Sequence, residues 1–377
     1  LEAIEFFRHL NTLVCGRNPG AVMIAEESTA WPMVTGKAED GGLNFTYKWN
    51  MGWMHDFLDY MKLDPYFRKN AHHMMTFAMQ YAYSENYILV LSHDEVVHLK
   101  CSMINKMPGL GFDKFANLKA GYAFMMGHPG KKLLFMGQEF AQPREWSEAR
   151  SLDWFVLDNP LNQGVQRWVK ALNNLYNAND ALYANDSDVM GFEWIDCDHP
   201  DKGVVSFIRR GSTPSKQLLF ICNFVPVEYD NYEVGAPCFT TYKEVLNSDD
   251  VQFGGAGRLN SGKIKAIDKK TERMPYSISV TVPPLSTVVL EYDYTDVTPE
   301  DILKKKEAEK KAAAAKRAAE KKTAAKKTAT EKKDVETTEV VKKESEKKTA
   351  ATKTKETVSK TKPAQTKAAV SKKTTKK

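Results

Sequence analysis

Residues 87–98 read YILVLSHDEVVH, and they indicate the fold class more directly than any other stretch. It begins as a continuous apolar run of strand length and then changes abruptly to a serine, a histidine and two acids. A buried strand that ends in ionisable side chains is typical of a parallel α/β sheet, where ligands bind at the carboxyl ends of the strands. The stretch therefore predicts a strand over 87–91 with candidate site residues, His93 and Asp94, directly after it.

Two further stretches have the same form. The run AVMIA at 21–25 is followed by Glu26 and Glu27, and the run KLLFM at 132–136 is followed by Gln138 and Glu139 after one glycine. Because the carboxyl ends of parallel strands meet at one edge of a sheet, these strands predict one shared site. The alternative interpretation is that each polar cluster is only a turn or a helix cap.

The first 184 residues alternate between strand and helix patterns. A short strand is expected over 45–50, in addition to the three apolar runs. Apolar residues at helical spacing predict helices over 1–12, 51–61, 71–84, 112–126 and 161–176. A closed β/α barrel needs eight strands and about 250 residues. The pattern, with four strands, therefore predicts half of such a TIM barrel.

The pattern changes twice further along the chain. From about residue 186 short strands with a period of 2 alternate with Gly, Pro, Asn and Asp clusters, which predicts an antiparallel β-sandwich. From about residue 298 the composition collapses to Lys, Ala, Thr and Glu, which predicts a disordered tail with transient helix around 299–327. We thus expect three regions: the half barrel at 1–184, the sandwich at 185–297 and the tail at 298–377.

The net charge of +6 combines two parts of opposite sign. Residues 301–377 hold 26 Lys and Arg against 11 Asp and Glu, which leaves 28 basic and 37 acidic residues for 1–300. The acidic globular part therefore needs a different explanation from the basic tail, for which we expect either an anionic polymer as partner or no specific partner.

Several classes of protein are not indicated. No apolar run approaches the roughly 20 residues of a membrane span, and the acidic start at Leu1 does not resemble a signal peptide. The five Cys are scattered without CxxC pairs, which predicts reduced, buried thiols and a cytoplasmic protein. Since the chain opens without a methionine and directly on a helix pattern, we expect a fragment cut inside a domain.

The candidate site residues indicate chemistry at a glycosidic bond. Glu26 and Asp94 are paired carboxylates near aromatic side chains; one protonated carboxyl can donate to a leaving oxygen, while an ionised one stabilises an oxocarbenium-like centre or attacks it. No cluster has metal-ligand spacing, and no phosphate loop or serine elbow occurs. We therefore expect no metal and no cofactor.

At these residues the chain resembles a known family, the bacterial 1,4-α-glucan (glycogen) branching enzymes of the α-amylase superfamily. The resemblance runs from residue 1 to about 294 and excludes the tail. The matching motifs are AEEST (25–29), WNMGWMHD (49–56), LSHDEVVH (91–98), FDKFANL (112–118), LFMGQEFAQ (134–142) and PPLSTVVL (283–290).

The resemblance implies a TIM barrel followed by a β-sandwich, and it implies roles for three residues. Glu26 corresponds to the general acid/base, Asp94 to the transition-state stabiliser and His93 to the histidine at the cleavage point. Besides these, Trp49, Gln138 and Glu139 are expected to bind the α-glucan substrate, with a place in the core as the alternative for Trp49. The implied reaction cleaves an α-1,4 bond with retention and transfers the chain to a 6-hydroxyl.

The sequence departs from the family in one respect. The family's nucleophile is an Asp in an Arg-x-Asp-Ala-Val context, which does not occur here. We therefore expect the C-terminal half of the barrel, inactive alone. The alternatives are a hydrolase or trehalose-forming relative on the same fold, and an inactive glucan-binding fragment. Among the remaining polar residues we interpret Glu27 as a capping or supporting carboxylate, and His72, His73 and His98 as packing or loop residues.

Overall fold

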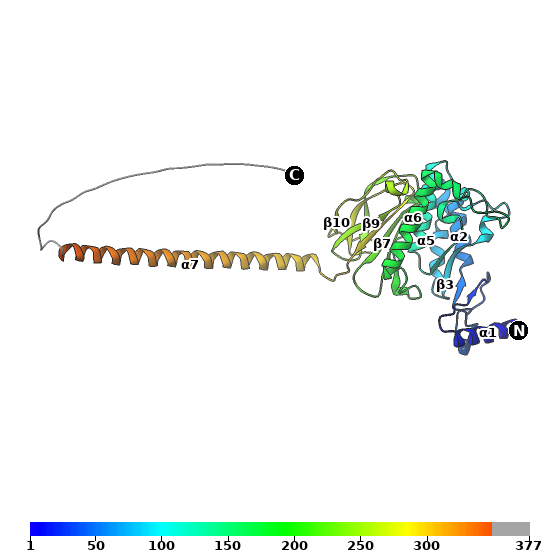
Figure 1. The fold of residues 1–377 in the computed structure, drawn as a ribbon, viewed down its shortest axis with the longest axis horizontal. Coiled ribbons are helices and arrows are strands. Elements are labelled where there is room, and N and C mark those ends of the chain that lie inside the picture. Colours follow the sequence, from blue (N-terminus) through cyan, green and yellow to red (C-terminus); the bar gives the residue numbers. More distant parts are fainter. Residues whose placement is uncertain (349–377) are drawn as a thin grey trace, which may run out of the picture. The chain divides into compact units, whose positions relative to one another are not determined.

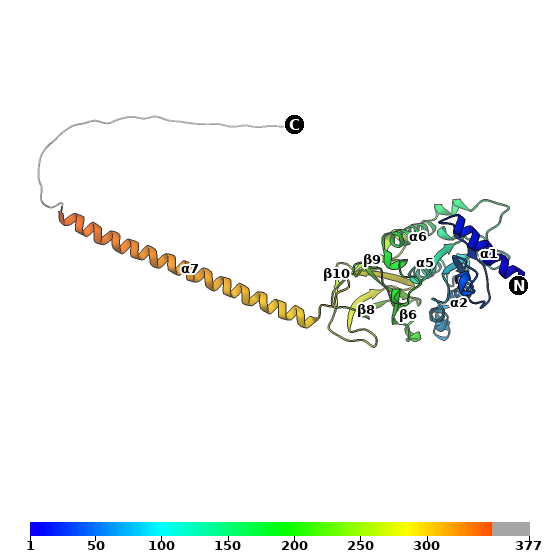
Figure 2. The ribbon, with the colours of Figure 1, turned by 90° about the horizontal axis from the view of Figure 1, so that it is seen from below.

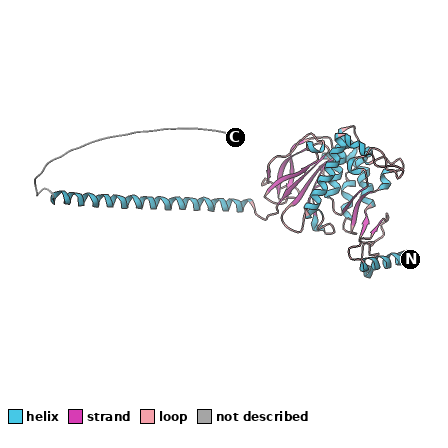
Figure 3. Ribbon diagram, viewed as in Figure 1, coloured by secondary structure: helices cyan, strands magenta, loops and turns pink. Residues whose placement is uncertain are grey.

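The computed structural model describes residues 1–348, with side chains described as far as residue 327. The chain divides into two compact units, Leu1–Ile302 and Leu303–Lys377. Figure 3 shows that the strands of the first unit form two groups separated by helices.

The first group is a parallel sheet of four strands. Its members are β1 (Ile24–Ala25), β2 (Tyr47–Trp49), β3 (Tyr87–Leu91) and β4 (Lys131–Leu134), and they lie side by side in chain order. Ala25 pairs with Lys48, Lys48 with Tyr87, and Leu91 with Leu134. The predicted α/β region with four strands is therefore confirmed.

Helices connect these strands. They are α1 (Glu2–Arg17), α2 (Met51–Lys62), α3 (His73–Thr76), α4 (Met103–Lys106), α5 (Phe112–Gly127) and α6 (Pro160–Ala178). The start of α2 is fixed by Asn50, whose side chain accepts a hydrogen bond from the Trp53 amide at 2.9 Å. Asn159 caps α6 in the same way, and Pro160 occupies its first turn. The sequence alone indicates both starts.

The predicted helix over 71–84 is wrong. The structure has the four-residue α3, with 3₁₀ turns at 65–71 and 77–80 on either side. Arg68, in the first of these turns, is buried and donates to the carbonyls of Met61 and Phe224 and to the Asn117 side chain. These bonds hold the turn at 65–71 in place, and a local pattern does not reveal them.

The second group of strands is antiparallel. Strands β5 (Phe192–Asp196), β6 (Val204–Arg209), β7 (Gln217–Asn223), β9 (Thr241–Asn247), β10 (Lys263–Lys265) and β12 (Ser286–Tyr292) form one sheet in the order β10-β9-β12-β7-β6-β5. Strands β8 (Tyr229–Ala236) and β11 (Tyr276–Val282) form a two-stranded ribbon. The predicted antiparallel region is confirmed, and it holds the eight strands from β5 to β12.

The central strands of the six-stranded sheet are buried on both faces. Val204 and Ile208 of β6 pack with residues of β8 and β11 in one apolar cluster, whereas Val205 and Phe207 pack with the helices in another. All six residues of β6 and all seven of β7 are buried. Figure 1 shows α5 and α6 between this sheet and β3. The β region therefore rests directly on the helical layer.

The opposite end of the first unit is less well covered. Helix α1 lies far from β10 in both views (Figures 1 and 2), and its one buried residue is Asn11. Phe6 is 60% exposed, and Val22 and Ile24 beside β1 are 53% and 47% exposed. Apolar surface thus concentrates around α1 and the β1 edge.

The second unit contains a long helix, α7 (Pro299–Lys348), which begins just before it. Thr298 caps its start: the Thr298 hydroxyl accepts from the Asp301 amide, and the Asp301 carboxylate accepts from the Thr298 amide at 3.1 Å. We expected disorder with transient helix, and the difference reflects a run without Gly or Pro from 300 to 348, rich in Lys, Ala and Glu. The rest of the predicted tail, 349–377, lies outside the described residues.

Two smaller expectations concern cysteines and membranes. All five Cys are free, and Cys222 and Cys238 are buried, but Cys101 is exposed, so the prediction of buried thiols is wrong there. None of the helices described in residues 1–348 has the length and apolar character needed to cross a membrane.

Candidate active site

All six predicted site residues lie at the carboxyl ends of the four parallel strands. Glu26 directly follows β1, and Trp49 is the last residue of β2. His93 and Asp94 form the first turn after β3, and Gln138 and Glu139 begin the 3₁₀ turn after β4. Because neighbouring strands are parallel and paired, these residues share one edge of the sheet.

Glu26 and Glu27 differ in their environment. Glu26 is exposed, and in the part of the chain that the structure describes it forms no hydrogen bond or ion pair. Glu27 accepts from the buried Lys48 ammonium at 2.6 Å and from the Thr29 amide at 2.7 Å. Partial burial raises the pKa of Glu27, but the hydrogen bonds from Lys48 and Thr29 outweigh it and bring the pKa below its ordinary value. Glu27 is thus held as an anion, which fits a supporting role.

Trp49 lines a hollow at this edge. The hollow has a volume of about 720 Å³ and lies between the segment after β1 and the start of α2. Its wall also contains Glu27, Trp31, Asp56 and Tyr81. Burial raises the pKa of Asp56. The hollow combines aromatic rings with carboxylates, the combination that binds the apolar faces and hydroxyls of sugars.

His93 and Asp94 form a second group with the strand end of β4. The His93 Nε2 lies 3.0 Å from the Asp94 carboxylate, and both side chains are about half exposed. The His93 ring is 5.8 Å from the ring of Phe135, which in turn packs edge-on against Trp146 at 5.2 Å. The histidine is therefore positioned by an aromatic side chain of the neighbouring strand.

Gln138 and Glu139 are mostly engaged by the protein itself. Gln138 is 3% exposed and donates through Nε2 to the Leu91 carbonyl at 3.1 Å. Its Oε1 atom is buried and accepts no hydrogen bond from the described residues. Glu139 accepts from the Gly137 amide at 2.7 Å. Each side chain retains an oxygen acceptor that no described hydrogen bond uses.

The structure brings the six residues to one edge, but in the described part of the chain the residues at the ends of β1 and β2 are not joined to those after β3. Within residues 1–348 no hydrogen bond or ion pair joins Glu26 or Trp49 to His93 or Asp94. The predicted proximity of Glu26 and Asp94 therefore remains a prediction.

Sequence reasoning missed two residues that shape the site. Lys48 is buried in β2 and anchors Glu27, and its signal was a lysine between two aromatic residues of a strand. Glu145 accepts from the amides of Leu99 and Cys101, both of which have left-handed backbone angles. It thereby ties the loop after β3 to the loop after β4. No local signal identifies a contact across more than 40 residues.

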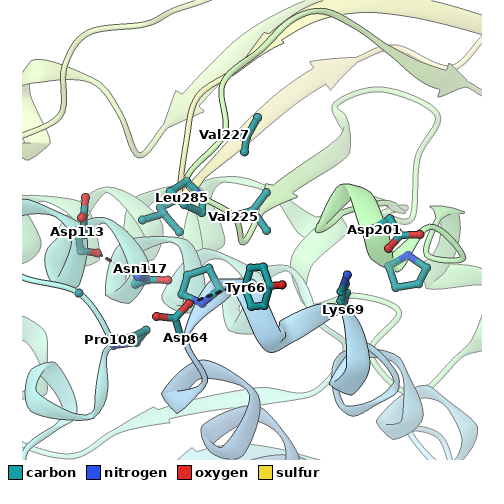
Figure 4. A pocket seen from close by; sticks show the side chains of 14 residues that line it. Asp64, Tyr66, Lys69, Pro108, Asp113, Asn117, Asp201, Val225, Val227 and Leu285 are labelled. Atoms are coloured by element: carbon teal, nitrogen blue, oxygen red, sulfur yellow. Dashed lines mark hydrogen bonds between the residues drawn. The ribbon is translucent and has the colours of Figure 1, made fainter.

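A second hollow, of about 490 Å³, lies apart from these residues, since none of the six lines it (Figure 4). Asp64, Tyr66 and Lys69 form one wall, and Val225 and Val227 of the β region form another. Tyr66 is 73% exposed, and the Lys69 ammonium lies 5.8 Å from its ring centre. Among the described residues no group of three or more His, Cys, Asp or Glu side chains is placed to hold a metal ion.

Comparisons with known proteins match both parts of the first unit. Residues 194–293 match the family model of the alpha amylase C-terminal all-beta domain. The chain is 54% identical over 292 residues to a 1,4-alpha-glucan branching enzyme of Butyrivibrio fibrisolvens, and 51% identical over 290 residues to one of Rubrobacter xylanophilus. The resemblance predicted from the motifs is therefore confirmed.

The matches are partial on the side of the relatives. The two alignments cover 78% and 77% of this chain but 46% and 40% of those enzymes, so the chain spans less than half of their length. Among solved structures, AmyP, which is bound to maltose, matches with a TM-score of 0.54 at 12% identity, over 78% of this chain and 63% of AmyP. This last similarity supports the fold alone.

Proposed function

We propose that this chain forms the C-terminal part of a 1,4-α-glucan branching enzyme, to which it contributes the second half of a closed β/α barrel and the β domain. The observation that carries the proposal is the 54% identity over 292 residues. In a chain of 377 residues an alignment of that length has to include about residues 86–292, and therefore His93, Asp94, Gln138 and Glu139.

Three features of the sheet support the half barrel. Within the described residues β1 pairs with β2 alone and β4 with β3 alone, so both outer edges are open to further strands. A hollow of about 640 Å³ beside β4 is lined by apolar side chains that include Phe135 and Leu172. The exposed apolar residues of α1 and β1 lie at the other edge. Further strands would close the barrel and cover these surfaces.

In the proposed reaction Glu26 is the general acid and base. As acid it protonates the oxygen of the α-1,4 bond, while a nucleophilic carboxylate from outside these 377 residues attacks the anomeric carbon and forms a glycosyl-enzyme. As base, Glu26 then removes the proton from the 6-hydroxyl of an acceptor glucan, whose oxygen displaces the carboxylate. The two displacements together retain the anomeric configuration. The exposed position of Glu26 at a strand end suits a group that meets substrate.

The remaining residues bind and polarise the glucan. The Asp94 carboxylate stabilises the positive charge of the oxocarbenium-like transition state and accepts from sugar hydroxyls, and His93, beside it, contacts the sugar at the cleavage point. Trp49 offers an aromatic face in the hollow after β2. Glu139 contributes an oxygen acceptor, whereas Gln138, whose Oε1 atom is buried, reaches the glucan only if the turn after β4 moves. The five free cysteines fit the cytoplasmic location that we propose for the enzyme.

The test uses the full-length protein and a Glu26→Gln variant. We expect the variant to lose at least 90% of the branching rate while retaining glucan binding, because general acid catalysis contributes about 10²–10⁴-fold. Branching is measured on amylose by the loss of iodine colour together with a count of reducing ends. Glu39→Gln, which neutralises an exposed carboxylate later in the same loop, is the matched control and should keep the wild-type rate.

Two outcomes would contradict the proposal. If the Glu26→Gln enzyme keeps more than a tenth of the wild-type branching rate, Glu26 is not the general acid and base. A wild-type enzyme that increases reducing ends without forming branches would indicate a hydrolase on the same fold instead.

A further inference from the structure

We propose that helix α7 is a binding surface for duplex DNA, held along the phosphates without regard to base sequence. The inference is independent of glucan chemistry, because it concerns the second unit of the chain and the charge that the sequence places there.

The charge of α7 is dense in its first half. Residues 304–327 contain eleven Lys and Arg against three Glu, a net charge of +8. At 1.5 Å per residue these 24 residues extend over about 36 Å, which gives roughly one net positive charge per 4–5 Å. Duplex DNA carries one negative charge per about 1.7 Å, so the helix meets a partner of higher and opposite charge density.

The cations surround the helix. They occur mostly in adjacent pairs five or six residues apart: 305–306, 310–311, 316–317, 321–322 and 326–327. At about 100° per residue, successive pairs project about 120–140° apart around the helix axis. All side chains from 303 to 327 are exposed, and the sequence offers no apolar stripe along this part. A helix that lies in a membrane surface, or that pairs with a partner helix, needs such a stripe.

A cylinder that is cationic on every side fits a groove with phosphates on both walls. The major groove of B-DNA is about 12 Å wide and admits an α-helix of about 10–12 Å diameter. Residues 301–377 contain no aromatic side chain, so the tail has nothing on which unpaired bases could stack. Phosphate contacts therefore remain as the means of binding, and a duplex is the preferred form of nucleic acid.

The experiment measures binding of the full protein to a fluorescently labelled 24-base-pair DNA by anisotropy, at 50–200 mM salt. We expect the affinity to fall about 10³-fold or more over this range, as it does for proteins that contact six or more phosphates. The variant exchanges six cations for Gln: Lys310, Lys311, Lys316, Arg317, Lys321 and Lys322. It should bind at least about 100-fold more weakly, and the slope of log affinity against log salt should become shallower by about 5.

A matched control exchanges six alanines of the same helix for Gln: Ala308, Ala312, Ala313, Ala314, Ala318 and Ala319. It should bind DNA as the wild type does, and circular dichroism should show equal helix content in both variants. The proposal is overturned if the six-cation variant binds like the wild type. It is also overturned if single-stranded DNA of the same length, or vesicles of an anionic phospholipid at equal phosphate concentration, bind more tightly than the duplex.

Discussion

Lys119 offers a direct test of how the two parts of the first unit are joined. It lies on α5, is 2% exposed, and donates through Nζ to the carbonyls of Ser248 at 2.7 Å and Phe253 at 2.8 Å in the β region. Burial lowers the pKa of Lys119 from 10.5 to about 8, against the opposing influence of Asp249 and Asp250. The charged form of Lys119 in the folded protein therefore lowers the free energy of unfolding.

The size and sign of this cost follow from proton linkage. Below pH 8 the lysine is protonated in both the folded and the unfolded protein, and the destabilisation is complete, about 3 kcal/mol for a pKa difference of about 2.5. Above pH 8 the folded protein releases the proton, while the unfolded chain keeps it until about pH 10.5. Stability therefore rises with pH in this window, by about 2 kcal/mol between pH 7.5 and 9.5.

The assay is urea unfolding of the full-length protein and of Lys119→Met at several pH values from 7.0 to 9.5. The variant leaves two carbonyls unpaired, which costs about 1–3 kcal/mol each at every pH, so the pH dependence is the informative quantity. We expect the wild type to gain about 2 kcal/mol on the variant between pH 7.5 and 9.5. Lys170→Met, at an exposed lysine of α6, serves as the control. The reasoning is refuted if the difference in free energy of unfolding between the wild type and Lys119→Met stays constant within about 0.5 kcal/mol from pH 7.5 to 9.5.

Three further outcomes are expected. Deleting residues 298–377 from the full-length enzyme should leave the branching rate and the melting temperature unchanged, whereas a large fall in melting temperature would show that the tail docks on the acidic part. The 377-residue chain alone should form no branches in amylose at any concentration, and measurable branching would mean that another carboxylate, for example Glu139, acts as nucleophile. The isolated region 185–297 should bind a hydrophobic dye or aggregate, and a monomeric, cooperatively unfolding domain would contradict the two-faced burial of its sheet.

The parallel sheet was predictable because its signals are local. Strands β1, β3 and β4 are apolar runs that end in polar residues, and the caps Asn50 and Asn159 can be recognised from one or two neighbouring residues. The edge that carries the site follows from strand direction alone. The distance between Glu26 and Asp94 does not, because it depends on the twist of the sheet and on the conformation of the loops after β1 and β3.

The contacts that fix the site were not predictable, because their partners are distant in sequence. Glu145 holds the amides of Leu99 and Cys101 from the next loop, and Arg68 reaches a carbonyl 156 residues away. In both cases a charged side chain forms hydrogen bonds with backbone groups of a distant segment, groups that have no partner among the described residues of that segment. The sequence shows where the charged residues are, but it does not show which backbone groups they bind.

In the β region, two strands are buried at every residue, a pattern that differs from the expected period of 2. We predicted a sandwich from strands that alternate between apolar and polar residues, but the runs VVSFIR and QLLFICN are buried along their whole length, on both faces of the sheet. Phe207 and Phe220 stack at 5.1 Å on the face that meets α5, and a side chain at Gly127 would come within 2.7 Å of Phe207.

A side chain at Gly164 of α6 would come within 2.5 Å of the Phe253 carbonyl oxygen, so both helices approach the β region at glycines. Exposing each phenylalanine would cost about 1.5–3 kcal/mol, a large share of the stability of a small domain. The sheet therefore contributes to two apolar cores, one on each face, and α5 and α6 pack against one of these faces. This packing stabilises the helices next to β3 and β4, and so the loops that hold the candidate site residues, although the outer edges of the parallel sheet are open.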